Sequence, residues 1–515
     1  MTHNGHLADQ HVWPDIRHFS LATSHKMLGS RDCARRGPYR GAETSMSTNE
    51  ANASDLALRD LEGLLPDLAE FYKDVHSHPE LSMQETRTAK LAADRLRAAG
   101  YEVTTGVGKT GVVGLLRNGD GPTVMLRADM DALPIQEATG LPYASKATAT
   151  DREGNTVPVS HMCGHDMHVT WLVGAAKLFA NTRASWRGTL MAVFQPAEET
   201  GEGAQAMIDD GLFKRFPKPG VILGQHVMVG PSGTVAGRAG AITSAADSLQ
   251  IRLFGRGAHG SMPQASIDPV VMAASTVMRL QTVVSREVAA TEAAVLTVGV
   301  LQAGTKENVI PDEAIIKLNV RTFDAGVRTR VLAAIERIAN AEAAASGAPR
   351  PPEITTIDQY PLNVNNRDAT KRVVDAFRGH FGAERVRETG PAPASEDFGS
   401  FGAEWHVPSV FWFVGGTDPE VYAKAKEANR LNELPVNHSP KFAPVLHLIY
   451  LRHVSLSIRQ KAVSWISSRL CSILWAPSSS RLAGRWRGSS ENSICSAFWY
   501  CRSRRGTREA SRGTC

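Results

Sequence analysis

Hydrophobic positions recur at two different spacings along the chain, and the change between them predicts its elements. Leucines three or four residues apart within 55–100 predict two helices, the second closed by Gly100. Short apolar runs follow and predict strands at GVVGLLRN, TVMLRADMD, GTLMAVFQPAEE and GVILGQHV, with a buried-face helix over 169–180. This alternation of strands and helices predicts an α/β domain with a mainly parallel sheet and helices on both faces.

The pattern changes between residues 240 and 352. Strands are expected at SLQIRLFGRG, AVLTVGVLQAG and EAIIKLNVRTF, with long helices at DPVVMAASTVMRLQTVVSRE and VRTRVLAAIERIANAEAAA. The first helix opens with Asp268 before Pro269, which is a helix-start signal. We therefore expect an inserted small α+β domain with two helices on a four-stranded sheet. The expected division is an extension at 1–54, the main domain at 55–239 and 353–445, the inserted domain at 240–352 and an atypical tail at 446–515.

Charge and cysteine are spread unevenly over the 515 residues. The tail carries 12 Lys or Arg against 2 Asp or Glu, so the rest of the chain is mildly acidic although the formal net charge is +5. Four of the six cysteines lie in the tail and a fifth is Cys33, so no disulfide framework is expected in the main body. A mildly acidic body gives no reason to expect nucleic acid as a partner. We find no membrane-length apolar run and no secretory signal, and we expect a cytoplasmic protein.

Both ends of the chain depart from the patterned middle. After KFAPV, serine and arginine dominate and the helical periodicity fades. One interpretation is a basic tail that binds an acidic surface. The other, which we favour, is unselected sequence such as a shifted reading frame would produce. Residues 1–45 are interpreted as an upstream extension before Met46, and neither end is given a fold.

Cys163 is the only cysteine between residues 46 and 445, and it lies two residues before His165 in the motif HMCGHD. Residues two apart face the same side on an extended segment or tight turn, and Gly164 permits such a turn. Thiolate and imidazole are donors that zinc and other divalent ions prefer. Ligands of parallel sheets bind beyond the carboxyl ends of the strands. Further donors follow the predicted strands and are expected to meet there: Asp129, Asp131, Glu198, Glu199, His226 and His438.

The adjacent pair Glu198 and Glu199 indicates a division of roles. Neighbouring side chains at the end of an extended strand point apart, so one carboxylate can bind a metal while the other faces a water. A metal lowers the pKa of its bound water toward neutrality. A second carboxylate in reach can then take the proton and pass it to a leaving amine.

Most of the chain resembles the metal-dependent amidohydrolases and peptidases of family M20. The resemblance runs in order over about residues 60–445 and rests on HMCGHDMHVTWLVGAAKLF, FQPAEETGEGA, GQHV, GRGAHGSMP, ENVIPDEA, NVRTFD, SEDFG and VNHSPKF. HSHPELSMQET and LRADMDALPI match the branch of hippurate hydrolases, N-acyl-amino-acid amidohydrolases and auxin-conjugate (IAA-amino acid) hydrolases. The resemblance implies hydrolysis of N-acetyl, N-benzoyl or similar amino acids with two divalent ions, either Mn, Zn, Co or Ni. It ends before the tail, where such proteins normally finish with one more helix.

The resemblance also implies roles for single residues. Glu198 matches the general base and Asp131 an acidic residue that orients a ligand. The inserted domain would act as a lid and dimerisation domain, in a homodimer or homotetramer. There, His259 matches a histidine that stabilises the oxyanion and reaches into the partner's active site in dimeric members, while Asn308 and Arg321 match contacts to the substrate. An arginine fork suits a carboxylate. Five residues match the metal ligands: Cys163, His165, Glu199, His226 and His438.

Several alternatives stay open. Asp129 is a further candidate ligand, and Arg321 could instead form a surface ion pair. Rival functions are a peptidase of the same superfamily acting on dipeptides or C-terminal residues, a hydrolase with Cys163 as its nucleophile, and a non-catalytic or impaired relative. The acyl group, the metal and the oligomeric state are left open. We interpret five neighbouring residues as supporting the site rather than reacting: His161, His168, Ser395, Glu396 and Asp397.

Overall fold

The structure is a computed structural model that describes residues 61–446. The expected extension over 1–54 and all but the first residue of the expected tail lie outside these residues. The larger sheet has eight strands in the order β1-β2-β6-β3-β7-β18-β8-β17. Their bounds are β1 Glu102–Val107, β2 Gly111–Asn118, β3 Thr123–Asp129, β6 Gly188–Gln195, β7 Val221–Pro231, β8 Val235–Gly237, β17 Val386–Glu388 and β18 Ser409–Thr417.

The centre of this sheet is parallel, and the side that begins with β1 is antiparallel. Strands β6, β3, β7 and β18 pair in parallel, whereas β1 with β2, β2 with β6, and β18 with β8 pair antiparallel. All eight residues of β6 are buried, which explains its continuous apolar run. The expected α/β fold with a mainly parallel sheet is thus confirmed.

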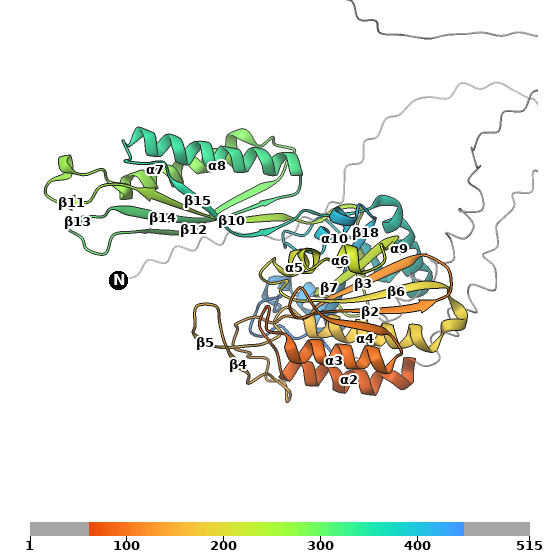
Figure 1. Cartoon of the computed structure of the whole chain (residues 1–515). Helices are drawn as coiled ribbons and strands as arrows, with labels where there is room; N and C mark the ends of the chain where they lie inside the picture. The colour runs from red at the N-terminus through yellow and green to blue at the C-terminus, as the bar shows by residue number, and fades with distance from the viewer. Residues whose placement is uncertain (1–60, 447–515) are drawn as a thin grey trace, which may run out of the picture. The chain divides into compact units, whose positions relative to one another are not determined.

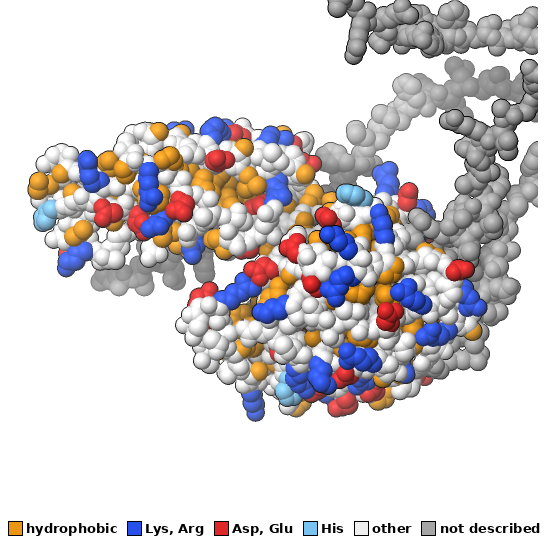
Figure 2. All heavy atoms as spheres, viewed as in Figure 1, with side chains coloured by type: hydrophobic (Ala, Val, Ile, Leu, Met, Phe, Trp, Pro, Cys, Tyr) orange, Lys and Arg blue, Asp and Glu red, His pale blue; other side chains and the backbone are white. Residues whose placement is uncertain are grey.

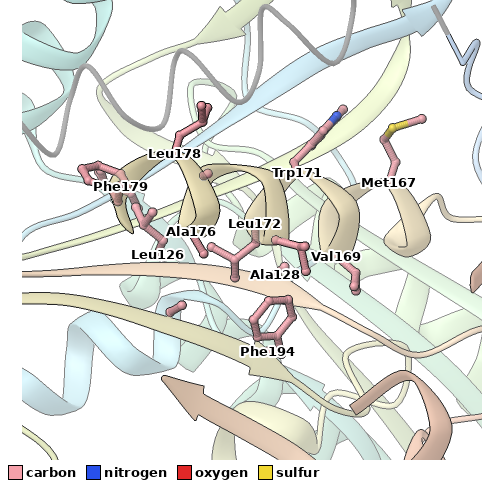
Figure 3. Close-up of a cluster of buried hydrophobic side chains, with 14 of the residues drawn as sticks. Leu126, Ala128, Met167, Val169, Trp171, Leu172, Ala176, Leu178, Phe179 and Phe194 are labelled. Carbon is pink, nitrogen blue, oxygen red and sulfur yellow. The ribbon is translucent and has the colours of Figure 1, made fainter. Parts of the chain in front are cut away.

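Helices cover both faces of the sheet (Figure 1). On one face, α4 packs its apolar side chains against β3 and β6, and Figure 3 shows Val169 and Leu172 lying toward Phe194. The other face carries a second buried cluster with residues of α5, α6 and α10. The helices of the first face are α2 Leu61–Ser77, α3 Thr86–Ala98, α4 His165–Asn181 and α9 Arg367–Phe381, and those of the second are α5 Gly203–Asp209, α6 Leu212–Arg215 and α10 Gly399–Trp405.

Two predicted element boundaries shift where local geometry takes over. The helix expected over 169–180 begins earlier, at His165, because Gly164 precedes it with a φ of 88° and turns the chain into the helix. The strand predicted at GVILGQHV continues beyond it to Pro231, paired with β18 along this length, so His226 lies inside β7 and not at its end. The helix start at Asp268 agrees with the prediction, since its side chain accepts from the backbone N–H of Val270.

A second sheet of four antiparallel strands has the order β12-β14-β10-β15. Helices α7 and α8 lie over it and share its buried cluster (Figure 1). Strand β14 alternates buried and less buried positions, as expected when one face of a sheet is covered. The bounds are β10 Ala245–Phe254, α7 Pro269–Thr282, β12 Ala294–Ala303, β14 Glu313–Thr322, α8 Ala325–Ala345 and β15 Glu353–Tyr360.

The fourth strand of this sheet lies beyond the boundary expected at residue 352. β15 pairs with β10, so the small sheet extends to Tyr360 because its last strand closes the free edge of β10. The remaining elements are short: β4 Thr148–Thr150, β5 Thr156–Pro158, β9 Gly240–Thr243, β11 Ala258–His259, β13 Val309–Ile310, β16 Asn363–Asn365 and α11 Pro419–Glu427. No helix within 61–446 has the length and apolar content needed to cross a membrane.

Candidate metal centre and substrate cleft

Five residues expected to bind metal lie together at the carboxyl ends of the central strands. They come from the turn before α4 and its first residue, the turn after β6, the interior of β7 and the loop after α11. Cys163 Sγ is 3.4 Å from His226 Nε2. Glu199 Oε2 is 3.3 Å from His438 Nε2, and Glu199 Oε1 is 3.8 Å from His165 Nε2. Sulfur, nitrogen and oxygen donors thus converge from segments distant in sequence.

The orientation of the histidine rings fits metal binding. His165 Nδ1 lies 2.9 Å from the carbonyl oxygen of Asp131 and donates to it, so that Nε2 faces the carboxylates. His226 Nδ1 donates to the carbonyl of Val227 at 2.7 Å, so its Nε2 faces the Cys163 sulfur. Such outer hydrogen bonds fix the tautomer in metal sites. His165 Nε2 and Glu199 Oε1 are buried and have no hydrogen-bond partner among the described residues, as expected for atoms that bind a cation.

The electrostatics of the cluster also favour a cation. Burial alone would lower the pKa of His165, but the carboxylates of Asp129, Asp131 and Glu199 raise it to about 10. Burial, and then Glu199 and Glu198, raise the pKa of the Cys163 thiol well above its usual value. A thiolate at this position therefore requires a neighbouring cation, and a coordinating metal ion deprotonates a thiol directly.

Asp131 holds the turn that carries the two glutamates. Its Oδ1 accepts from the backbone N–H of Glu198 at 3.1 Å, and its Oδ2 accepts from that of Glu199 at 3.0 Å. The preceding residue, Ala197, has a φ of 48°, and its N–H donates to Glu85 Oε1 at 2.8 Å. Two buried carboxylates therefore fix the backbone from which the Glu198 and Glu199 side chains project.

Asp129 and His168 are held by protein groups. His168 Nδ1 lies 2.5 Å from Asp129 Oδ1, and its Nε2 accepts from the N–H of Val227 at 2.9 Å. Both ring nitrogens are thereby engaged, and burial lowers the pKa of His168. Asp129 Oδ2 accepts from Arg127 at 2.7 Å. This chain of hydrogen bonds occupies both ring nitrogens of His168 and favours a structural role for both residues, even though they place donor atoms within 4.8 Å of those of His165 and His226.

Arg127 is a buried cation that the sequence analysis missed. Its Nη2 donates to Glu396 at 2.7 Å and to Asp397 at 3.1 Å, which draws the predicted supporting loop against the sheet. Burial raises the pKa of Glu396 to about 8, although Arg127 opposes the shift. Burial, then Glu396 and Glu199, raise the pKa of Glu198 well above its usual range. The sequence signal was an arginine inside an otherwise apolar strand.

A cleft of about 420 Å³ opens directly onto the metal-type side chains. Cys163, Glu198, Glu199, His226 and His438 line one part of it. Its other walls are of two kinds, apolar from Met228, Phe411 and Phe413, and polar from Thr243, Arg321, Tyr360 and Ser395. A larger hollow of about 620 Å³, lined by Lys109, Arg152 and Glu202 among others, contains none of the candidate ligands, so we assign the chemistry to the smaller cleft.

The three substrate-contacting candidates of the small sheet region are placed differently. Arg321 lines the cleft, and its Nη1 donates to the carbonyl of Pro393 at 2.7 Å and to Ser395 Oγ at 3.1 Å. His259 and Asn308 lie beside one another, since the N–H of Gly260 donates to the Asn308 carbonyl at 2.8 Å. Both are exposed, and neither lines the cleft of its own chain.

Tyr360 and Asn437 also line the cleft and were not predicted. The Tyr360 hydroxyl donates to the carbonyl of Glu198 at 3.1 Å, so the end of β15 touches the turn that carries the glutamates. Asn437 precedes the candidate ligand His438, which was the available signal for it. For Tyr360 the sequence offered none, because its position depends on the end of a strand that was not predicted.

Comparisons with known proteins agree with this geometry. Hippurate hydrolase of Campylobacter jejuni is 40% identical over 329 residues, which cover 64% of this chain and 82% of that protein. Thermostable carboxypeptidase 2 of Saccharolobus solfataricus is 34% identical over 395 residues, 75% of this chain and 93% of that one. The Bacillus subtilis YXEP protein, described as a dinuclear metal binding peptidase from the M20 family, has a similar structure with a TM-score of 0.61 and 28% identity, covering 79% of this chain and 99% of that one. The family model described as peptidase family M20/M25/M40 matches residues 125–437, and the chain belongs to this family of hydrolases.

Proposed function

We propose that this chain is a metal-dependent amidohydrolase that cleaves N-acyl amino acids, such as N-acetyl or N-benzoyl amino acids, to a carboxylic acid and a free amino acid. The position of Glu198 carries the proposal. Its carboxylate lines the same cleft as four candidate metal ligands and as Arg321. The similarity to hippurate hydrolase, whose name gives an N-acyl amino acid as its substrate, supports the substrate class.

Two divalent ions, manganese, zinc, cobalt or nickel, would be held by the five converging ligands. Glu199 lies within one donor group with Cys163 and His438 and within another with His165 and Glu198, so a single carboxylate reaches both positions. Mixed sulfur, nitrogen and oxygen donors suit these borderline metals. When bound, such ions lower the pKa of a coordinated water and polarise the carbonyl of the amide.

Glu198 handles the proton in this proposal. Its carboxylate accepts a proton from the attacking water and delivers it to the departing amine. Burial and the nearby Glu396 and Glu199 raise its pKa, which favours holding the proton between these two transfers. Asp131 keeps the backbone of both glutamates in place, so that the base stays aligned without reorganisation.

The two kinds of wall in the cleft suit the two ends of such a substrate. Arg321 would bind the free carboxylate of the amino acid, because a guanidinium matches a carboxylate with paired hydrogen bonds. The apolar wall of Met228, Phe411 and Phe413 would face the acyl group, since apolar surface is favourably removed from water there.

His259 and Asn308 would complete the cleft of a partner protomer. They are exposed and outside the cleft of their own chain, which is the placement expected of residues that act across a dimer. His259 would then stabilise the oxyanion and Asn308 would contact the substrate. Strand β12 is an edge of the small sheet, and its Val295 and Leu301 side chains are each about half exposed. An exposed apolar edge strand supports this region as the dimer contact. Hydrophobic side chains are spread over the surface of this region in Figure 2.

A second candidate function is a metallo-carboxypeptidase or dipeptidase. The 34% identity to thermostable carboxypeptidase 2 favours it, and it would use the same metals, base and carboxylate-binding arginine. A cysteine nucleophile is less consistent with the geometry. The Cys163 thiol is buried, with a raised pKa, whereas reactive cysteines have a lowered one.

The test is a screen of N-acyl amino acids and dipeptides with the purified protein, measuring the released amine. We expect turnover of N-acyl amino acids that a chelator abolishes, that manganese, zinc, cobalt or nickel restores, and that Glu198→Gln lowers by about 10²–10⁴-fold in kcat. Preferred turnover of dipeptides would favour the second candidate. Activity that persists in chelator and is abolished by thiol alkylation, or that is unchanged in Glu198→Gln, would contradict the metal-dependent mechanism.

A further inference from the structure

The side-chain amide of Asn437 bridges two segments that carry candidate metal ligands. Its Nδ2 donates to the backbone carbonyl of Cys163 at 3.1 Å and to that of Val227 at 3.0 Å. The first carbonyl belongs to a candidate ligand, and the second belongs to the residue after His226. One amide group therefore ties the turn before α4 to strand β7 at the point where their side chains meet.

The acceptor on β7 is shared with the ring of a ligand. The Val227 carbonyl accepts both from Asn437 and from His226 Nδ1, the latter at 2.7 Å. A carbonyl oxygen has two lone pairs and can accept both bonds. The position of this oxygen sets the orientation of the imidazole, which places His226 Nε2 at 3.4 Å from the Cys163 sulfur. Asn437 therefore acts on the carbonyl that aims the ring.

The next residue binds to the same turn through its backbone. The N–H of His438 donates to the Met162 carbonyl at 2.8 Å, so two consecutive residues of the loop hold two consecutive residues of the turn. His438 has a φ of 68°, a conformation that non-glycine residues adopt at an energetic cost and keep only where surrounding bonds impose it. Asn437 is thus attached to the segments of Cys163, His226 and His438.

We infer that Asn437 is a positioning residue of the metal centre, which sets the spacing of the Cys163 sulfur and the His226 ring before metal binds. This inference rests on the proposed function, because it assumes that these side chains are ligands. Residues that orient metal ligands typically change metal affinity by about 10–100-fold when replaced. Asn437 acts on the two backbone carbonyls, and its Nδ2 also lies 3.9 Å from the Cys163 sulfur, so its effect falls on the geometry of the ligands and their affinity for metal.

Asn365 provides a matched control within the same fold. Its Nδ2 also donates to two backbone carbonyls of separate segments, those of Arg238 and Phe411, each at 2.8 Å. It is buried and belongs to β16, and neither of its acceptors is a candidate ligand or lies next to one. The Asn365 Oδ1 also accepts from the N–H of Phe411 at 2.7 Å, so loss of the Asn365 amide removes at least as many hydrogen bonds between segments and leaves the metal ligands in place.

The experiment titrates the metal-stripped full chain with cobalt(II) and measures both affinity and the near-ultraviolet absorption of the cobalt–thiolate bond. A Cys163→Ser variant identifies which absorption comes from the thiolate. We expect Asn437→Ala to bind cobalt about 10–100-fold more weakly, with a shifted or weakened thiolate band. Asn365→Ala is expected to lose stability while retaining the affinity and the spectrum of the unmodified protein.

Several results would overturn the inference. Wild-type affinity and an unchanged band in Asn437→Ala would show that the amide does not position the ligands. An equal loss in Asn365→Ala would show that any side-chain amide linking two segments has this effect. Thermal unfolding of the metal-free variants checks that each is folded. If Asn437→Ala does not fold, Asn437→Ser takes its place and is judged by the same criteria. If the unmodified protein itself binds no cobalt, the proposed metal-dependent function fails together with the inference. If the unmodified protein binds cobalt and Asn437→Ala binds it equally well, only the inference fails.

Discussion

Replacing Arg127 by methionine should strongly destabilise the protein, because it leaves three buried carboxylates without their cation. The Arg127 side chain is fully buried and bonds to Asp129 at 2.7 Å, Glu396 at 2.7 Å and Asp397 at 3.1 Å. It also donates to Gln195 Oε1 at 2.8 Å. Burial disfavours the charge of the guanidinium, yet the carboxylates raise its pKa further, so the arginine is charged in the folded state.

The magnitude follows from the cost of unpaired buried charge. Removing one partner of a buried ion pair costs about 3–5 kcal/mol, since the remaining charge loses its compensation. Here one arginine compensates three carboxylates, so we expect a loss of at least about 4 kcal/mol. That is a large fraction of the roughly 5–15 kcal/mol by which domains are stable. Arg127→Lys keeps the charge and loses the fork, so it should cost about 1–3 kcal/mol.

Urea unfolding of the metal-stripped chain, followed by circular dichroism, measures these differences. Burial already raises the pKa of Glu396 to about 8 and also raises that of Asp397 in the folded state, and both should rise further without Arg127. The folded variant then binds more protons than the folded unmodified chain, so the deficit of Arg127→Met should shrink as the pH falls toward about 8 through Glu396, and further at acid pH through Asp129. The double variant Arg127→Met with Glu396→Gln should recover part of the loss. A deficit below about 1 kcal/mol that is independent of pH would refute this reasoning.

Three further outcomes follow from the same structure. Asp166 and Glu137 outweigh the burial of His76 and raise its pKa to about 9. The protonated ring should therefore contribute about 3 kcal/mol to the free energy of unfolding, and this contribution should be lost as the pH rises from 6.5 through 9. Urea unfolding at each pH measures the loss, which should be absent in His76→Gln. Gly164→Ala would place a Cβ 2.4 Å from a Val227 methyl group at a φ of 88°. We expect the free energy of unfolding to fall by about 1–3 kcal/mol and metal binding, measured by calorimetry, to weaken. Unchanged values of both would show that the turn is not constrained. Arg321→Lys should raise KM about 10-fold for N-acyl amino acids and have little effect on their carboxamides, whereas equal effects on both would exclude a carboxylate contact.

Much of the fold could be predicted because its signals are local. The apolar runs of β2, β3, β6 and β7, and the start of α7 at Asp268, are written in a few consecutive residues. β15 was missed because only three of the eight residues of this edge strand are partly covered, so it shows no strong apolar run. Its pairing with β10 is a long-range contact that moves the end of the small sheet to Tyr360.

The sequence allowed us to predict which side chains of the candidate site could bind metal, but less well how these side chains and their hydrogen-bond partners are arranged. Cysteine, histidine and glutamate at strand ends indicated which side chains meet, since parallel strands bring their carboxyl ends to one edge. The partners of Arg127 could not be foreseen, because Glu396 lies in a loop far along the chain and any buried arginine needs some carboxylate. The hydrogen bonds that use both nitrogens of His168, and so favour a structural role for it, depend on atomic geometry.

The most direct test is a crystal structure of the metal-reconstituted protein, with the ions located by their anomalous scattering. We predict two ions per chain, bound by Cys163 Sγ, His165 Nε2, Glu199, His226 Nε2 and His438 Nε2 at about 2.0–2.3 Å, with the Glu198 carboxylate left uncoordinated beside them. Ions bound elsewhere, or an active enzyme with no ion among these five residues, would contradict the proposed centre.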